Sequence, residues 1–165
     1  MIGLVKMIKW LSISVVVIVL DQWSKYLVVG VMSLGEHIPG FRYFSWVRWH
    51  NDGAAFSLLA GSGGWARWFF VGLAVGFVGF LIFELRRLGR TGSALHLVYA
   101  LIIGGALGNM IDRLLQGYVV DFLLFHYQEY YFPAFNVADA ALSVGAGIWV
   151  VLLISEEINK RREPH

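Results

Sequence analysis

The sequence predicts an all-α membrane protein with four transmembrane helices and a small aromatic-rich β hairpin or sheet on the outer membrane surface. Hydrophobic residues make up 58% of the 165 residues, charged residues only 15%, and the mean hydropathy is +0.67. A soluble domain would have about 25% charged residues. The excess of apolar side chains therefore excludes a water-soluble enzyme and a disordered chain. Four long apolar runs and an aromatic-rich segment between the first two are the other observations behind this fold class.

At about 20 residues per crossing, the chain has room for roughly four spans. We expect a single integral-membrane domain that covers residues 1–165. The predicted boundaries, in chain order, are spans at 8–31, 65–85, 94–114 and 136–155, with outer loops at 33–64 and 115–133. The absence of cysteine excludes a disulfide, a thiolate metal site and a cysteine nucleophile.

The first span begins like a secretory signal peptide, with an apolar stretch behind basic residues. That stretch leads into the sequence Asp21-Gln22-Trp23-Ser24-Lys25 rather than into a small-residue cleavage site, and the chain then becomes apolar again. We therefore interpret it as a retained transmembrane helix.

The outer loop at 33–64 has a character of its own. Residues 41–49 are rich in aromatic side chains and roughly alternate, and Asn51-Asp52-Gly53 then supplies turn residues ahead of the apolar segment 54–59. This pattern predicts a small hairpin or sheet with its rings at the headgroup level. The alternative is a segment that only anchors and caps the bundle.

The spans at 65–85, 94–114 and 136–155 have basic residues near the ends that we place in the cytoplasm. Eight of the 13 lysines and arginines fall on one side if both termini and the loop at 86–93 are cytoplasmic. These are Lys6, Lys9, Arg86, Arg87, Arg90, Lys160, Arg161 and Arg162. The basic pI near 9.0 is thus explained by topology, and we expect no nucleic-acid partner.

Polar side chains gather at the outward ends of three predicted spans. They are Asp21, Lys25, Asn109, Asp112, Arg113, Asn136 and Asp139. Ionisable groups inside spans are costly, usually face the bundle interior and indicate a functional site.

Each polar residue also has a structural interpretation. Asp21 and Lys25 are four residues apart, a spacing typical of a self-neutralising pair. Asp112 could neutralise Arg113 or another cation. Asn136 and Asp139 have the N-cap and N3 spacing of a capped helix start. Caps and neutral pairs do not easily explain so many polar groups at one depth, however.

One more carboxylate, Asp121, lies among apolar residues on both sides. Such surroundings favour its protonated form, and a second carboxylate nearby strengthens that effect. Asp121 and Asp139 are therefore the best candidates for a pair that shares one proton. The ionised member would take a proton from water while the protonated member polarises a carbonyl group, which predicts amide hydrolysis without a metal or a covalent intermediate.

Other mechanisms are less consistent with the sequence. Ser24 and Lys25 are adjacent, so on a helix they point about 100° apart, which disfavours a serine–lysine pair. His37, His50, His96 and His126 lack metal-ligand spacing, and we expect packing or interfacial roles, with no metal and no cofactor. A small proton-coupled transporter is the alternative function, but it predicts polar residues throughout the membrane depth and two related halves.

Five motifs, in order, resemble those of the lipoprotein signal peptidases, also called type II signal peptidases. They are Asp21-Gln22-x-Ser24-Lys25, Asn51-x-Gly53-Ala54-Ala55-Phe56, Gly105-x-x-Gly108-Asn109-x-x-Asp112-Arg113, Val119-Val120-Asp121-Phe122 and Phe135-Asn136-x-Ala138-Asp139. The resemblance covers essentially the whole chain. It implies an aspartic endopeptidase of the bacterial inner membrane that cuts a prolipoprotein signal peptide just before a diacylglyceryl-modified cysteine and is inhibited by globomycin.

The resemblance also implies roles for individual residues. Asp121 and Asp139 match the catalytic dyad. Polar and glycine residues that hold the substrate or support the dyad are matched by Asn51, Gly53, Asn109, Arg113 and Asn136. Structural positions are matched by Asp21, Lys25 and Asp112. The expected partners are lipid-modified prolipoprotein signal peptides, membrane lipid and globomycin-like inhibitors, and we expect a monomer. We also expect Gly104, Gly105 and Gly108 to leave space for lateral entry of a lipid-modified substrate.

Overall fold

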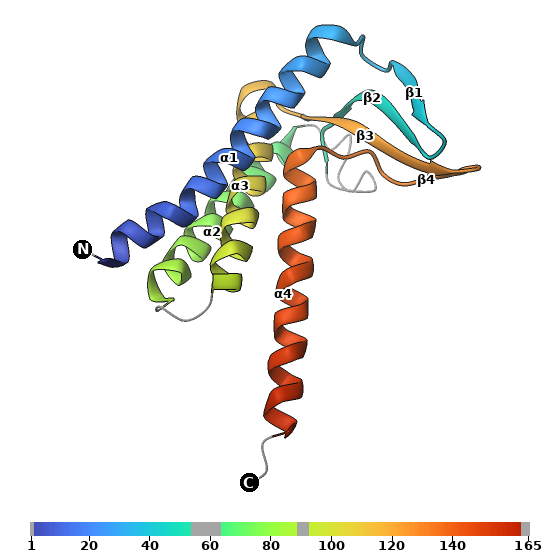
Figure 1. The fold of residues 1–165 in the computed structure, drawn as a ribbon. Helices are drawn as coiled ribbons and strands as arrows, with labels where there is room; N and C mark the ends of the chain where they lie inside the picture. The colour runs from blue at the N-terminus through green and yellow to red at the C-terminus, as the bar shows by residue number, and fades with distance from the viewer. Residues whose placement is uncertain (1, 54–63, 89–92, 163–165) are drawn as a thin grey trace.

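The computed structural model describes residues 2–53, 64–88 and 93–162, and in these ranges it has four long helices (Figure 1). They are α1 (Ile2–Val31), α2 (Trp65–Arg87), α3 (Ser93–Gln116) and α4 (Val137–Arg162). All four are long and apolar enough to cross a membrane, which confirms the predicted number of spans.

The helices extend further than the apolar runs that predicted them. Helix α1 begins at Ile2 rather than at residue 8, and α4 continues to Arg162 rather than ending at 155. In the added turns of α4, Lys160 forms an ion pair with Glu156 and Arg161 with Glu157, each at i,i+4 spacing. Such ion pairs stabilise a helix that is exposed to water. The apolar run therefore predicts the membrane span, whereas the helix itself continues beyond it.

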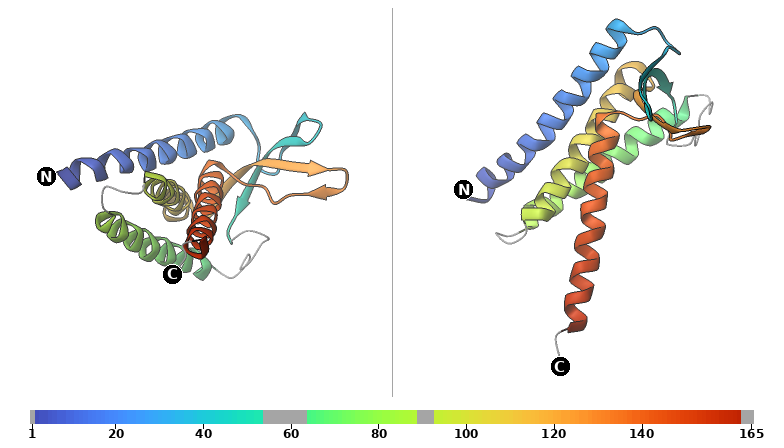
Figure 2. Two further views of the ribbon diagram at one scale, coloured as in Figure 1. Left: turned by 60° about the horizontal axis from the view of Figure 1, so that its bottom comes forward. Right: turned by 45° about the vertical axis from the view of Figure 1, so that its right-hand side comes forward.

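Helix α3 lies at the centre of the bundle and packs against the other three helices (Figure 2). Its glycines are the points of closest approach. Gly104 lies against Ser14 and Val17 of α1, and Gly105 lies against Ala138 of α4, with no room for a Cβ atom at either position. The prediction that these glycines leave space for substrate entry is therefore wrong, because neighbouring helices fill the space.

A four-stranded antiparallel sheet covers one end of the bundle, in the order β1-β2-β3-β4. The strands are β1 (His37–Phe41), β2 (Phe44–Asn51), β3 (Val119–Tyr127) and β4 (Tyr130–Tyr131). Figure 1 shows the sheet projecting sideways from the bundle, at the end away from both termini.

The predicted aromatic hairpin is present, but it turns at a different place. Residues 41–49 fall largely in β2, whose hairpin partner is the preceding strand β1. Asn51-Asp52-Gly53 is not the hairpin turn, because Asn51 is the last residue of β2 and Asp52 and Gly53 follow the strand; the segment 54–59 lies outside the described residues. Strand β3 lies within the predicted outer loop 115–133. The sequence does not predict this strand, because its nearly continuous apolar residues have no period-two alternation.

Two features bring the sheet over the bundle. Gly117, with φ of 88°, directly follows α3 and turns the chain into β3, a conformation that a residue without Cβ adopts easily. Arg48 of β2 donates from Nη1 to the carbonyl oxygen of Met32 (2.6 Å), just after α1. In the register, Trp49 pairs with Asp121 and Asn51 with Val119, so β2 ends beside the buried aspartate of β3.

Candidate active site

Asp121 of β3 and Asp139 of α4 meet at a single asparagine, Asn136. The Asn136 side-chain Nδ2 donates to Asp121 Oδ1 (2.8 Å), and its backbone N–H donates to Asp139 Oδ2 (3.3 Å). Asn136 is fully buried. One residue thus sets the position of both candidate catalytic carboxylates.

Asn136 is also the N-cap of α4. The backbone N–H of Asp139 donates to Asn136 Oδ1 (3.0 Å), and the Asp139 carboxylate accepts the Asn136 N–H in return. This reciprocal arrangement is the capping box predicted from the spacing. The structural and functional interpretations of Asp139 therefore do not compete, because the cap holds the carboxylate at the end of the helix that faces the sheet.

Asp121 is almost completely buried, with 3% of its surface exposed. Its Oδ2 accepts a hydrogen bond from Asn51 Nδ2 (3.0 Å). Burial and the neighbouring Asp139 carboxylate raise the pKa of Asp121 to about 7, against the opposing effect of the amide donors. Near neutral pH this carboxyl group therefore exchanges a proton readily, as a general acid or base requires.

Gly53 and Arg113 support Asn51 from the end of β2. The Gly53 N–H donates to Asn51 Oδ1 (3.1 Å), which turns the Asn51 amide nitrogen toward Asp121. Arg113 Nη2 donates to the Gly53 carbonyl oxygen (2.8 Å), and its guanidinium lies 4.8 Å from the ring centroid of Phe70 on α2. Asn51, Gly53 and Arg113 are thus linked by hydrogen bonds, although they come from two segments far apart in sequence. Together they position the amide that donates to Asp121.

Asn109 connects Asp139 to a buried cation. Asn109 Nδ2 donates to Asp139 Oδ1 (2.7 Å), and Asn109 Oδ1 accepts from Lys25 Nζ (3.1 Å). An ammonium group is only a donor, so the amide oxygen must face Lys25 and the amide nitrogen must face Asp139. Lys25 therefore fixes the orientation of the amide that holds the candidate catalytic carboxylate.

Lys25 lies between two buried carboxylates. Its Nζ is 2.8 Å from Asp21 Oδ2 and 2.9 Å from Asp112 Oδ2. Asp112 thus pairs with Lys25 and not with the adjacent Arg113. Asp21 Oδ1 also accepts the backbone N–H of Ala138 (2.9 Å). The cluster joins α1, α3 and the beginning of α4.

Gln22 belongs to this cluster, although no role was predicted for it. Its Nε2 donates to Asp112 Oδ1 (2.8 Å) and to the Gly108 carbonyl oxygen (3.2 Å). The sequence feature that could have identified Gln22 is its i,i+3 spacing from Lys25, which places the two side chains on one face of the helix.

Asp139 lines a large groove between α2, α3, α4 and the sheet, with a volume of about 840 Å³. The polar lining residues include Asn51, Asn109, Arg113 and Asp139. The remainder is mainly apolar and includes Phe70 and Leu73 of α2, Leu142 and Val144 of α4, and Phe125 and Phe132 of the sheet region. Asp121 does not line the groove but is linked to it by Asn51.

The residues of the disfavoured mechanisms have other partners. Ser24 Oγ donates to the backbone oxygen of Asp21 (2.9 Å), while Lys25 is held in its ion pairs. His50 stacks on Tyr118 with ring centroids 3.7 Å apart, and burial, together with Arg48, lowers its pKa. Across the described ranges, no three histidine, aspartate or glutamate side chains form a metal-binding group.

Spanning helices with buried carboxylates beside an apolar groove are the features of a membrane-embedded hydrolase, and comparison with known proteins gives the family. The model of a family described as signal peptidase (SPase) II matches residues 13–155. The chain therefore belongs to the lipoprotein signal peptidase family, as its motifs implied. This membership makes it a peptidase and disfavours the transporter alternative.

Relatives and solved structures agree with this membership. The chain is 42% identical to a lipoprotein signal peptidase of Alteromonas mediterranea over 94% of this chain and 86% of that protein. It is 47% identical to one of Ralstonia nicotianae over 93% of this chain and 86% of that protein. The fold is similar to a bacterial membrane enzyme solved in meso at 2.3 Å resolution, with TM-score 0.84, 28% identity and coverage of 95% and 94% of the two chains.

Proposed function

We propose that this protein is an aspartic endopeptidase that cleaves prolipoproteins just before the diacylglyceryl-modified cysteine, with Asp121 and Asp139 as its general acid and base. The observation that carries the proposal is the pair of carboxylates that both accept hydrogen bonds from Asn136, with Asp139 lining a mainly apolar groove. Such a groove suits a substrate that has both a lipid-modified residue and a membrane-embedded signal peptide.

In the proposed mechanism, Asp139 is ionised and takes a proton from a water molecule whose oxygen attacks the scissile carbonyl carbon. Asp121 is protonated and donates its proton to the carbonyl oxygen. As the tetrahedral intermediate collapses, Asp139 transfers its proton to the leaving amine, the C–N bond breaks, and Asp121 recovers a proton from the gem-diol. Protons and charges then return to their starting state.

The assignment of the base follows from the neighbours of each aspartate. Both Asp139 oxygens accept N–H donors, and one of these donors, Asn109, is itself bound to the Lys25 cation. The two amides that donate to Asp121, from Asn51 and Asn136, are not bound to a cation, and the pKa of Asp121 is raised to about 7, so that its protonated form is available near neutral pH. We therefore assign Asp139 as the initial base.

Arg113 is the proposed contact for the substrate backbone. Its side chain lines the groove, and its buried Nε has no hydrogen-bond partner among the described residues. A buried guanidinium donor that lacks a partner can donate to a peptide carbonyl oxygen at little cost.

We place the protein in the bacterial inner membrane as a monomer, with both termini cytoplasmic and the site near the periplasmic face. The basic residues at the end of the bundle opposite the sheet support this orientation, including Arg86 and Arg87 of α2 and Lys160 of α4. In it, the aromatic sheet would rest at the outer headgroup level.

Complementation tests this function in cells. In a bacterium depleted of its own lipoprotein signal peptidase, expression of this chain should clear the accumulated lipid-modified precursors, and addition of globomycin should restore their accumulation. Immunoblots of a lipoprotein separate precursor from mature form. Persistence of the lipid-modified precursor despite correct membrane insertion of the chain would contradict the proposal.

A further inference from the structure

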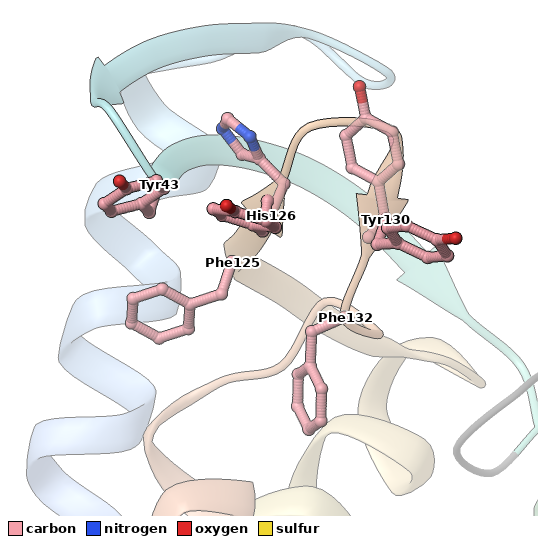
Figure 3. A pocket seen from close by; sticks show the side chains of 7 residues that line it. Tyr43, Phe125, His126, Tyr130 and Phe132 are labelled. Atoms are coloured by element: carbon pink, nitrogen blue, oxygen red, sulfur yellow. The ribbon is translucent and has the colours of Figure 1, made fainter.

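A second cavity, of about 640 Å³, lies at the far end of the sheet (Figure 3). Its walls are almost entirely aromatic. We call it the aromatic cup, and it is lined by Tyr43, Phe125, His126, Tyr127, Tyr130, Tyr131 and Phe132. The hydrolytic mechanism above uses none of these side chains.

The aromatic cup shares a wall with the catalytic groove. Phe125 and Phe132 line both cavities. Figure 3 shows these two rings pointing the same way, down from the β3–β4 hairpin, while His126 points in the opposite direction. A chain bound in the groove can therefore continue past Phe125 and Phe132 into the cup.

Strand β3 leads directly from Asp121 to the cup. Side chains alternate along a strand, so Asp121, Phe125 and Tyr127 lie on one face of β3. At a rise of roughly 3.3 Å per residue, Phe125 lies about 13 Å and Tyr127 about 20 Å along the strand from Asp121. An extended peptide that follows the strand from the aspartates therefore reaches the cup after about four to six residues.

The two cavities extend in different directions. Below the aspartates, the groove continues between Leu73 of α2 and Leu142 of α4, inside the helix bundle, where a membrane-embedded segment belongs. The cup is lined mainly by residues from the ends of β3 and β4. Figure 1 shows that this part of the sheet projects beyond the helices. If the signal peptide of a substrate occupies the groove, the segment that reaches the cup is the one after the cleaved bond.

We propose that the aromatic cup is a substrate subsite for the prolipoprotein segment about four to six residues after the cleaved bond, an inference that rests on the proposed function. Its rings would stack against apolar or aromatic side chains of that segment, and the hydroxyl groups of Tyr127 and Tyr130 would bind its main-chain polar groups. Strand β4 is the outermost strand of the sheet, so its outer edge also offers main-chain groups to an extended peptide.

The test compares two lipid-modified precursors that differ only in length after the modified cysteine. One ends about two residues beyond it and the other about eight, so that only the longer one can reach the cup. The double variant Tyr127→Ala/Tyr130→Ala removes two exposed rings from the cup. Phe41→Ala is the matched control, since it removes an exposed ring of β1 outside the cup, and both precursors are assayed with all three proteins.

We expect the double variant to lower kcat/KM about tenfold for the long precursor, mainly through KM, and to leave the short one unchanged. Phe41→Ala should alter neither. An equal loss for both precursors would overturn the subsite and assign the rings to membrane anchoring, and no loss for the long precursor would overturn it as well. If the wild-type protein cleaved neither precursor, the proposed function itself would fail, and the subsite with it.

Discussion

Asp121→Asn and Asp139→Asn, made separately, should each reduce cleavage of a lipid-modified precursor by about a thousandfold or more, because either change removes one partner of the proton exchange. Asparagine has nearly the shape of aspartate but cannot accept the proton of the attacking water or return one to the leaving amine. Precursor should accumulate in cells that express either variant, and the purified variants should show the same loss.

Folding controls are needed because both aspartates also accept structural hydrogen bonds. In either variant an amide nitrogen would face an N–H donor, so the thermal unfolding of both should be compared with that of the wild type. Glu129→Gln removes an exposed carboxylate of the β3–β4 turn and should retain full activity. Full cleavage by either aspartate variant would show that the dyad is assigned wrongly.

Lys25→Met should lower the free energy of unfolding by about 3–5 kcal/mol, because it leaves two buried carboxylates, Asp21 and Asp112, without their cation. It should also reduce activity, since Lys25 no longer orients Asn109 against Asp139. Denaturant-induced unfolding in detergent micelles, followed by tryptophan fluorescence, measures the first effect.

A control variant at the surface distinguishes the loss of a buried lysine from the loss of an exposed lysine. Lys160→Met breaks an exposed ion pair with Glu156 and should leave both stability and activity unchanged. Lys25→Met/Asp112→Asn removes one of the two unpaired carboxylates and should recover part of the lost stability. If Lys25→Met were as stable as the wild type, the buried cluster would not hold α1, α3 and α4 together.

The membrane fold could be predicted because its signal is averaged over long segments. Each span is a helix of more than 20 mostly apolar residues, so the number of helices does not depend on any single position. Polar residues stand out against that background, and for this reason Asp21, Asn109 and Asp139 were recognised before their partners were known. The capping box at Asn136 could also be read from local spacing.

The remaining features depend on contacts between segments distant in sequence. Strand β3 has a continuous apolar pattern that does not separate strand from loop or buried helix. Asp112 has a cation next to it in sequence, Arg113, yet pairs with Lys25 on another helix. A glycine in α3 indicates close approach or open space equally well from sequence alone, and helix packing decides in favour of close approach at Gly104 and Gly105.

The most direct measurement is the intact mass of the products formed by the purified protein from one prolipoprotein, supplied with and without its diacylglyceryl group. We predict that only the lipid-modified form is cut, into the free signal peptide and a chain whose first residue is the diacylglyceryl-cysteine. Cleavage of both forms at equal rates, or a product that begins at any other residue, would contradict the proposed function.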